Sequence, residues 1–439
     1  MMISLVAYAK QQRRSVAGNS FFLIANTLSG SLLGFLFWLV AARNLSGAHV
    51  GTGAAYISAL TFLTTVAEMG LGTALIRFAP ALGSRQAGFI NAALVMTALG
   101  TFLIAGIFAL CSPWWSSDLS MLGRSPLYFG VFVSSAVAFG VGQLLDRVFV
   151  AFQATQFLFI RNCAANLLRI ALLLGPLRVL GLAGLLVAIG GPALVTSGVA
   201  LVCYVPRAVP GYHLRPTFAW SMLAGKAAYT LGNHAALLVW NVPQFVYPLL
   251  VVALLGPEAN AQFYVNWMLA NTLFIVPTAV ATSAFAGAGH DPTMAGAAFW
   301  KTMRRTLAVL IPCAGTLLIA AHLILHIFGT IYLTAASGLL IYLVLSIFPY
   351  TFTTFVMAYQ RIHQQTGRVI WMSALVTLLC LVSSVGGARV DGLPGVGLGW
   401  LAGQSLGALV VLAAQWRKPR SVLHHAIAGL VRNLWSQRF

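Results

Sequence analysis

Long apolar segments recur along almost the whole 439-residue chain, and they restrict its fold more than any other feature. A helix needs about 20 apolar residues to cross the hydrocarbon of a bilayer, and about twelve segments reach that length. Charged residues make up only 7% of the sequence, too few to cover the surface of a soluble protein of this size. The sequence therefore predicts an all-α integral membrane protein, with spans near 19–42, 50–76, 88–111, 126–150, 157–177, 180–205, 228–255, 261–287, 304–328, 333–360, 367–386 and 394–416.

The two halves of the chain resemble each other. Val148–Gln153 recurs as Phe355–Gln360, and Ala42–Gly47 aligns with Val252–Pro257, at separations of 207 and 210 residues. Halves with the same even number of helices enter the membrane from the same side, so the repeat is parallel. The expected organisation has two pseudo-symmetric six-helix lobes: a cytoplasmic segment at 1–18, an N-terminal lobe at 19–205, a cytoplasmic linker at 206–227, a C-terminal lobe at 228–416 and a cytoplasmic basic amphipathic tail at 417–439.

The basic residues follow the predicted topology. With the N-terminus inside, about twenty of the 25 Lys and Arg residues fall on the cytoplasmic side, as the positive-inside rule requires. Both termini are therefore expected to be cytoplasmic, and the net charge of +19 indicates attraction to anionic inner-leaflet lipids rather than to nucleic acid. Arg161 is counted among these topological residues.

No phosphate-binding glycine loop, metal-ligand spacing or nucleophile–base pair is present in the sequence. We therefore expect no cofactor, no metal and no catalytic residues. A proton, a sodium ion or the membrane potential is the expected energy source.

Two of the six acidic residues, Glu68 and Asp146, lie within predicted spans. A charge at such a depth is costly and marks a functional candidate. Each is expected either to couple transport to an ion or to pair with an arginine of a neighbouring helix. Asp146 and Arg147 are adjacent, so their side chains diverge by about 100° and cannot both face one partner.

Three arginines are candidates for binding an anion. Arg169 lies well inside the fifth predicted span, too far from either end to reach the membrane surface easily. It is expected to bind an anion or, alternatively, to form a buried ion pair with Glu68 or Asp146. Arg147 and Arg77 are the other candidates. Arg77 has an alternative role, because an arginine near the end of a span can extend its charged group to the cytoplasmic surface of the membrane.

The seventh and eighth spans carry uncharged polar residues. Gln262 and Asn266 are four residues apart and so share one helix face. Such residues either bond neighbouring helices or recognise sugar hydroxyls. The saccharide-contact candidates are Asn233, His234, Asn241, Gln262 and Asn266, with Gln244 and Asn271 on the same helices.

Several short motifs resemble one known superfamily. They are Ala42–Ser46 with Val50–Gly51, Gly70–Gly72 with Ala74–Arg77, Pro248–Leu250, Leu255–Ala259 and Pro277. On these residues the chain resembles the multidrug/oligosaccharidyl-lipid/polysaccharide (MOP) exporters, and in particular their Wzx-type polysaccharide flippases.

This resemblance implies a V-shaped pair of lobes, as in the related MATE exporters, in the bacterial cytoplasmic membrane. It also implies alternating access, a polyprenyl-linked saccharide as substrate, and polysaccharide-assembly glycosyltransferases or a polymerase as partners. Arg169, Arg147 and Arg77 would hold the substrate phosphate. Two alternatives stay open: a cation-coupled small-molecule exporter, which would favour an acidic, aromatic cavity, and a membrane-embedded glycosyltransferase or polymerase, which generally needs a large outer loop or an acidic catalytic site.

Overall fold

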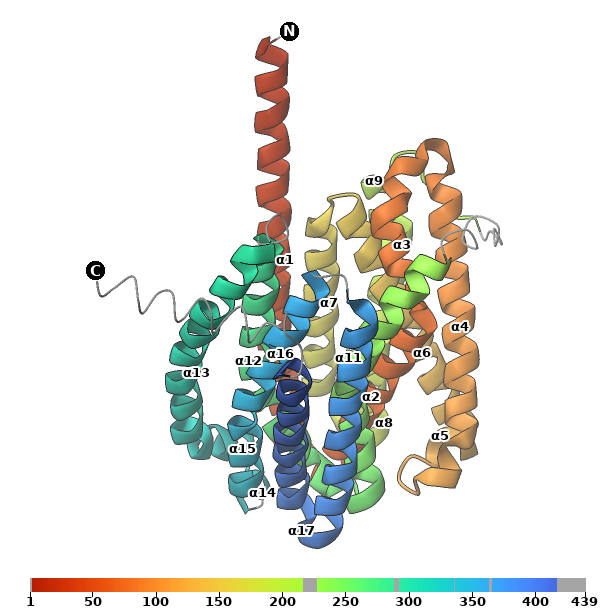
Figure 1. The fold of residues 1–439 in the computed structure, drawn as a ribbon. Coiled ribbons are helices and arrows are strands. Elements are labelled where there is room, and N and C mark those ends of the chain that lie inside the picture. The colour runs from red at the N-terminus through yellow and green to blue at the C-terminus, as the bar shows by residue number, and fades with distance from the viewer. Residues whose placement is uncertain (1, 216–226, 288–291, 335, 363–364, 417–439) are drawn as a thin grey trace, which may run out of the picture. The chain divides into compact units, whose positions relative to one another are not determined.

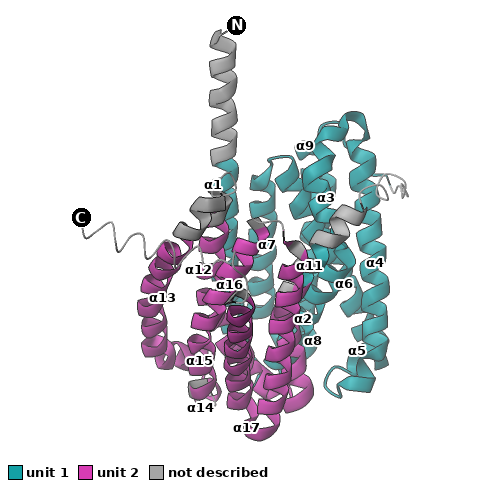
Figure 2. Cartoon of the chain, in the orientation of Figure 1, with its two compact units in different colours: residues 1–238 teal, residues 239–439 magenta. Residues whose placement is uncertain are grey.

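The computed structural model describes residues 2–215, 227–287, 292–334, 336–362 and 365–416, and almost all of them are helical (Figure 1). The predicted all-α fold is confirmed. The chain divides into two compact units, residues 1–238 and 239–439 (Figure 2). The boundary falls inside one helix, α11 (Ala227–Leu255), whereas the lobe boundaries drawn from the sequence stay a prediction. The predicted amphipathic tail, 417–439, lies outside the described residues.

Unit 1 is a helical bundle with a continuous apolar core. Its central helix, α6, packs against α2, α4 and α8, and α7 packs against α1 and α8. Phe89, Leu144 and Phe149 are fully buried in this core. They lie at the end of the bundle that the sequence predicts to face the cytoplasm. The helices are α1 (Met2–Asn44), α2 (Gly47–Glu68), α3 (Leu71–Phe78), α4 (Gln86–Trp115), α5 (Met121–Arg124), α6 (Pro126–Ala151), α7 (Thr155–Leu174), α8 (Gly181–Val199) and α9 (Val205–Ala208).

The second predicted span, 50–76, is not one continuous helix. Helix α2 starts at the N-cap Ser46, whose side chain accepts a hydrogen bond from the backbone N–H of His49. It ends at Glu68, because Met69 and Gly70 both adopt left-handed backbone conformations, with φ of 46° and 78°. Left-handed residues end a helix, and glycine adopts that conformation at no steric cost. Glu68 therefore sits in the last turn of α2, and Arg77 lies on the separate short helix α3.

Unit 2 is also a bundle, in which α12 packs against α13, α15 and α16. Residues 366–416 form one long helical segment, α17, interrupted at Asp391 and Gly392, where Gly392 has a φ of 57°. That interruption lies between the two last predicted spans. The remaining helices are α11 (Ala227–Leu255), α12 (Pro257–Gly287), α13 (Pro292–Phe328), α14 (Ile331–Thr334), α15 (Ala336–Leu345), α16 (Ile347–Ile362) and α17 (Thr366–Trp416).

A glycine stripe holds the two arms of α17 close together. Gly395, Gly399, Gly403 and Gly407 recur every four residues along the second arm and thus share one face. A methyl group at Gly403 would press on the backbone of Cys380 in the first arm. Small residues at this spacing let two membrane helices approach backbone to backbone.

Ten helices in the described part of the chain are long and apolar enough to cross a membrane, and Asn241–Leu255 is a shorter apolar helix. One of the ten, Gly367–Ala414, contains both of the last two predicted spans. The number of crossings and the side of the membrane on which the termini lie stay predictions.

Candidate functional site

A buried ion pair joins two successive helices of unit 1. The Nη2 atom of Arg161 on α7 donates to both carboxylate oxygens of Asp146 on α6, at 2.9 and 2.8 Å. The side chains are 8% and 25% exposed, respectively. Arg161, which the sequence marked only as a topological residue, is therefore the partner of one of the two intramembrane acids.

Polar side chains from two more helices complete this pair. The other terminal nitrogen of Arg161, Nη1, donates to Ser197 Oγ on α8 at 3.2 Å. Asn162 accepts from Arg161 at 2.7 Å and donates to Asn26 Oδ1 on α1 at 3.0 Å. Gly142 leaves room for the guanidinium, because a Cβ there would lie 2.5 Å from Nη1 of Arg161. The network links α1, α6, α7 and α8.

The second intramembrane acid, Glu68, lies 3.8 Å from the Nε atom of Arg147. This pair is looser and more exposed than the first, since its atoms are 3.8 Å apart and the Arg147 side chain is 52% exposed. Gly72 permits the contact, because a Cβ at that position would meet both side chains. Asp146 and Arg147 thus diverge to different partners, as their adjacency on a helix requires. Both acids are members of charge pairs, and their role in coupling stays a prediction.

Arg169 lies half-buried on α7, with its guanidinium carbon 5.3 Å from the centre of the Phe37 ring on α1. This distance is typical of a cation–π contact. The two acids named as its alternative partners are the ones paired with Arg161 and Arg147. Arg77 is exposed on α3, with its guanidinium over the neighbouring Phe78 ring. The structure places the three candidate arginines in unit 1 without testing their role.

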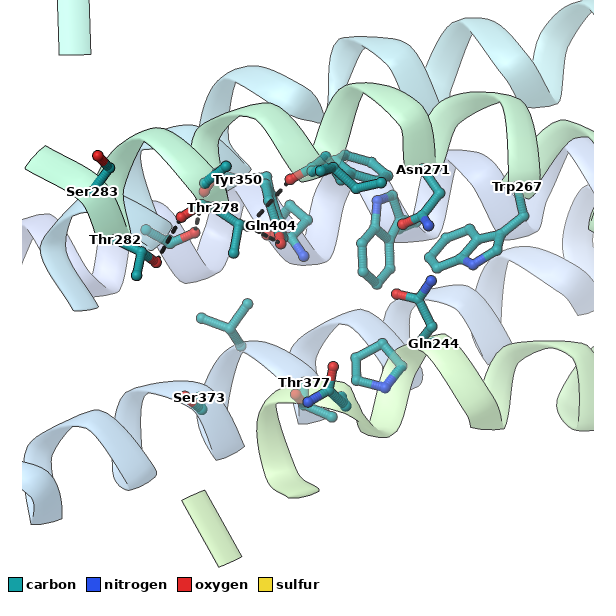
Figure 3. Close-up of a pocket in the computed structure, with 18 residues that line it drawn as sticks. Gln244, Trp267, Asn271, Thr278, Thr282, Ser283, Tyr350, Ser373, Thr377 and Gln404 are labelled. Atoms are coloured by element: carbon teal, nitrogen blue, oxygen red, sulfur yellow. Dashed lines mark hydrogen bonds between the residues drawn. The ribbon is translucent and has the colours of Figure 1, made fainter. Parts of the chain in front are cut away.

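Unit 2 contains a cavity of about 690 Å³ (Figure 3). This volume is within the range of small-molecule sites. Its wall combines aromatic rings with uncharged polar side chains. Figure 3 shows Gln244 and Asn271 at the same end of the cavity as Trp267, with Thr278, Thr282 and Ser283 toward the other end. The polar lining residues are Asn241, Gln244, Asn271, Thr278, Thr282, Ser283, Tyr350, Thr353, Ser373, Thr377 and Gln404.

Only some of the residues predicted to contact the saccharide line this cavity. Asn241 lines it, whereas Gln262 and Asn266 are not among its lining residues. Those two side chains share a helix face as expected, and Asn266 donates to the backbone oxygen of Gln262 at 2.8 Å. His234 is half-buried on α11 outside the cavity. Asn233 is on the same helix, but its side chain lies outside the described set.

Comparison with known proteins decides the family. A family model described as "Polysaccharide biosynthesis protein" matches residues 16–288, which is more than half of the chain. The chain belongs to this polysaccharide biosynthesis family. Among curated proteins, none matches the sequence.

Solved structures show that the fold of this polysaccharide biosynthesis protein is similar to that of the flippase MurJ and of MATE transporters. The lipid II flippase MurJ, in an inward closed conformation, matches with a TM-score of 0.72 at 13% identity, over 95% of this chain and 93% of MurJ. An inward-facing multidrug-resistance MATE transporter matches at 0.60 and 16%, over 88% and 94% of the two chains. A eukaryotic MATE transporter matches at 0.61 and 15%, over 95% and 99%. Such identities show the fold and not the substrate. Together with the family, they support a multi-pass membrane transporter or flippase.

The internal repeat predicted from the sequence of this polysaccharide biosynthesis protein pairs charged residues of unit 1 with lining residues of the unit 2 cavity. Glu68, Asp146 and Arg169 align with Thr278, Thr353 and Val376 at the repeat separations of 210 and 207 residues. All three counterparts line the unit 2 cavity. The equivalent positions thus carry charge in one unit and an uncharged wall in the other.

Proposed function

We propose that the protein is a flippase that moves a polyprenyl-phosphate- or pyrophosphate-linked saccharide from the inner to the outer leaflet by alternating access, for the synthesis of cell-surface polysaccharide. The observation that carries this proposal is the membership of the polysaccharide biosynthesis family. The saccharides of such pathways are built on lipid carriers, so their headgroup must cross the bilayer before it can be used outside.

The charge distribution supports a substrate with one anionic end and one neutral end. Arg169, Arg147 and Arg77 all belong to unit 1, and guanidinium groups bind phosphate oxygens bidentately and stay charged at every physiological pH. Among the residues that the structure describes, none of the side chains that line the unit 2 cavity is acidic or basic. In this proposal, the arginines of unit 1 hold the phosphate and the polyprenyl chain stays in the lipid.

The absence of acidic residues from the described lining supports the flippase over a cation exporter. A cavity that binds an organic cation gains from a carboxylate in its wall, because an uncompensated charge in a low-dielectric site is costly. The lining of unit 2 offers amides, hydroxyls and indoles instead.

Reconstitution tests the proposal. The purified protein is placed in liposomes with a fluorescent polyprenyl-pyrophosphate oligosaccharide, and a membrane-impermeant quencher reports the leaflet that holds the label. We expect the inner-leaflet pool to become accessible faster than in liposomes without protein. Equal rates would overturn the proposal. Efflux of ethidium under an ion gradient would favour the exporter, and a longer saccharide at the end of the reaction would favour a glycosyltransferase or polymerase.

A further inference from the structure

One continuous face of α12 forms a wall of the unit 2 cavity. Trp267, Asn271, Phe274, Thr278 and Thr282 all line it, at spacings of four, three, four and four residues. These spacings bring the side chains to one side of a helix. With a rise of 1.5 Å per residue, the stripe from Trp267 to Thr282 is about 22 Å long. The wall is thus long enough for more than one sugar ring in a row.

Two polar atoms of the lining are buried without a hydrogen-bond partner in the described part of the chain. They are the indole Nε1 of Trp267 and the amide Oε1 of Gln404. The two residues are only 5% and 3% exposed. Buried polar atoms are nearly always paired, so these two point to a ligand. The indole nitrogen only donates and the amide oxygen only accepts, and a hydroxyl group satisfies both kinds of atom.

The aromatic side chains at this end are held rigidly. The rings of Trp267 and Trp400 meet edge to face, with centroids 5.0 Å apart and an interplanar angle of 80°. Trp400 is fixed by a hydrogen bond from its Nε1 to Ser346 Oγ at 2.8 Å. Tyr247 stacks against Trp267 at 5.4 Å. Fixed indoles beside amides provide an apolar face and polar groups together, which suits the C–H face and the hydroxyls of a pyranose ring.

The uncharged lining of the cavity favours an uncharged ligand. The phenol of Tyr350 pairs with the hydroxyl of Thr278 at 3.2 Å, and among the described residues no carboxylate, ammonium or guanidinium group lines the cavity. An ionised ligand group would therefore lose its hydration without gaining a counter-charge. A neutral sugar meets no such cost.

We infer that this face of α12, together with Gln244, Trp400 and Gln404, binds an uncharged saccharide chain and discriminates against uronic acids and other charged sugars. One ring sits in the corner between Trp267 and Trp400, and the next rings follow the hydroxyls of Thr278 and Thr282. This inference rests on the proposed function, because it takes the saccharide of the lipid-linked substrate as the natural ligand.

Binding to the full chain in nanodiscs tests the inference without transport. The probes are maltotriose and chitotriose as neutral sugars, trigalacturonate as an acidic sugar and tetraphenylphosphonium as a cation. We expect at least one neutral trisaccharide to bind more tightly than both charged probes. Trp267→Phe removes the indole donor and Gln404→Met removes the amide acceptor, and each should weaken that binding about tenfold, the effect of one lost hydrogen bond. Trp371→Phe, on the exposed side of α17, is the matched control and should leave binding unchanged.

A measurement on the unsubstituted chain guards against misfolded variants. The protein is labelled with 5-fluorotryptophan, and its fluorine spectrum is recorded with and without the bound trisaccharide. The resonances of Trp267 and Trp400 should shift, and that of Trp371 should not. The inference is overturned if no neutral trisaccharide binds, if a charged probe binds more tightly, or if the Trp267 resonance stays in place.

Translocation rates distinguish failure of the neutral-sugar site from failure of the flippase function. If the protein translocates neutral and uronate-bearing lipid-linked trisaccharides at the same rate, and Trp267→Phe slows neither, the inference fails and the flippase function stands. If it translocates no lipid-linked saccharide and yet binds maltotriose or chitotriose as described, the flippase function fails and the neutral-sugar site stands.

Discussion

Asp146 and Arg161 lie on successive helices at the same depth, and both carboxylate oxygens of Asp146 accept hydrogen bonds from one guanidinium nitrogen of Arg161. Through Ser197 and Asn162, this pair also reaches α8 and α1. A buried pair of this kind is costly to form but still more costly to break on one side only, because the remaining charge is then uncompensated. The pair is therefore expected to fix four helices of unit 1 relative to one another.

Asp146→Asn should destabilise the protein by about 3 kcal/mol, because it leaves the Arg161 guanidinium buried without its counter-charge. The measurement is unfolding in detergent. The double variant Asp146→Asn, Arg161→Gln should recover part of the loss, since no isolated charge remains. A double variant as unstable as the sum of the two single variants would contradict this account of the pair.

Arg169→Gln should abolish most lipid-linked saccharide transport while the protein still folds. The change removes a cation from inside the membrane, where we place the substrate phosphate. Arg178→Gln removes the same charge from an exposed position in unit 1 and serves as the control. Initial translocation rates in liposomes are compared, with Arg169→Lys expected to retain part of the activity because it keeps the charge but not the bidentate geometry. Equal translocation rates for Arg169→Gln and Arg178→Gln would show that Arg169 does not bind the substrate phosphate.

Gly403→Ala should destabilise unit 2 by about 1–3 kcal/mol, because the added methyl group presses on the backbone of Cys380 and forces the arms of α17 apart. Gly386→Ala, on the same helix, adds a methyl group with nothing within 4 Å. That control should be neutral or slightly stabilising. The thermal midpoints of the two variants decide the matter, and equal midpoints would exclude close packing of the arms.

The hydroxyl of Tyr212 donates to Asn91 Oδ1 at 2.6 Å, and Asn91 in turn donates to the backbone oxygen of His213 at 2.8 Å. Burial raises the pKa of Tyr212 from 10.0 to about 12. The neutral phenol is thus favoured in the folded state, so its contribution to stability is complete below pH 10 and is lost as the pH rises toward 12. Tyr212→Phe should cost about 1 kcal/mol at pH 7.

The stability difference between Tyr212→Phe and the unsubstituted protein should stay constant from pH 6 to pH 9 and shrink above about pH 10. Urea unfolding at a series of pH values gives this difference. Tyr128→Phe removes a hydroxyl from another tyrosine of unit 1 as the control. A difference that grows with pH would have the wrong sign for a raised pKa.

The apolar segments were sufficient to predict the helical membrane fold, because a membrane-spanning backbone must satisfy its own hydrogen bonds and a helix does so within one segment. The break after Glu68 was not predicted, since the apolar run continues through Leu71 and Ile76 and hydropathy carries no information on φ. Gly70 was the available signal, as it tolerates the left-handed conformation.

The partner of Asp146 was also available in the sequence. Asp146 lies five residues before the end of α6 and Arg161 six residues after the start of α7, so the short connection between these helices places them at the same depth. The unit 2 cavity was less accessible to prediction. Trp267 and Gln404 are 137 residues apart, and only the packing of α12 against the other helices shows that both line one space.

Translocation of a lipid-linked saccharide is the central claim, and its initial rate in liposomes tests it most directly. The substrate is a fluorescent polyprenyl-pyrophosphate linked to a neutral trisaccharide, and the impermeant quencher is added at successive times. The account predicts that the protein raises the rate above that of protein-free liposomes and that Arg169→Gln lowers it to near that background. A rate equal to the background for the unsubstituted protein would contradict it.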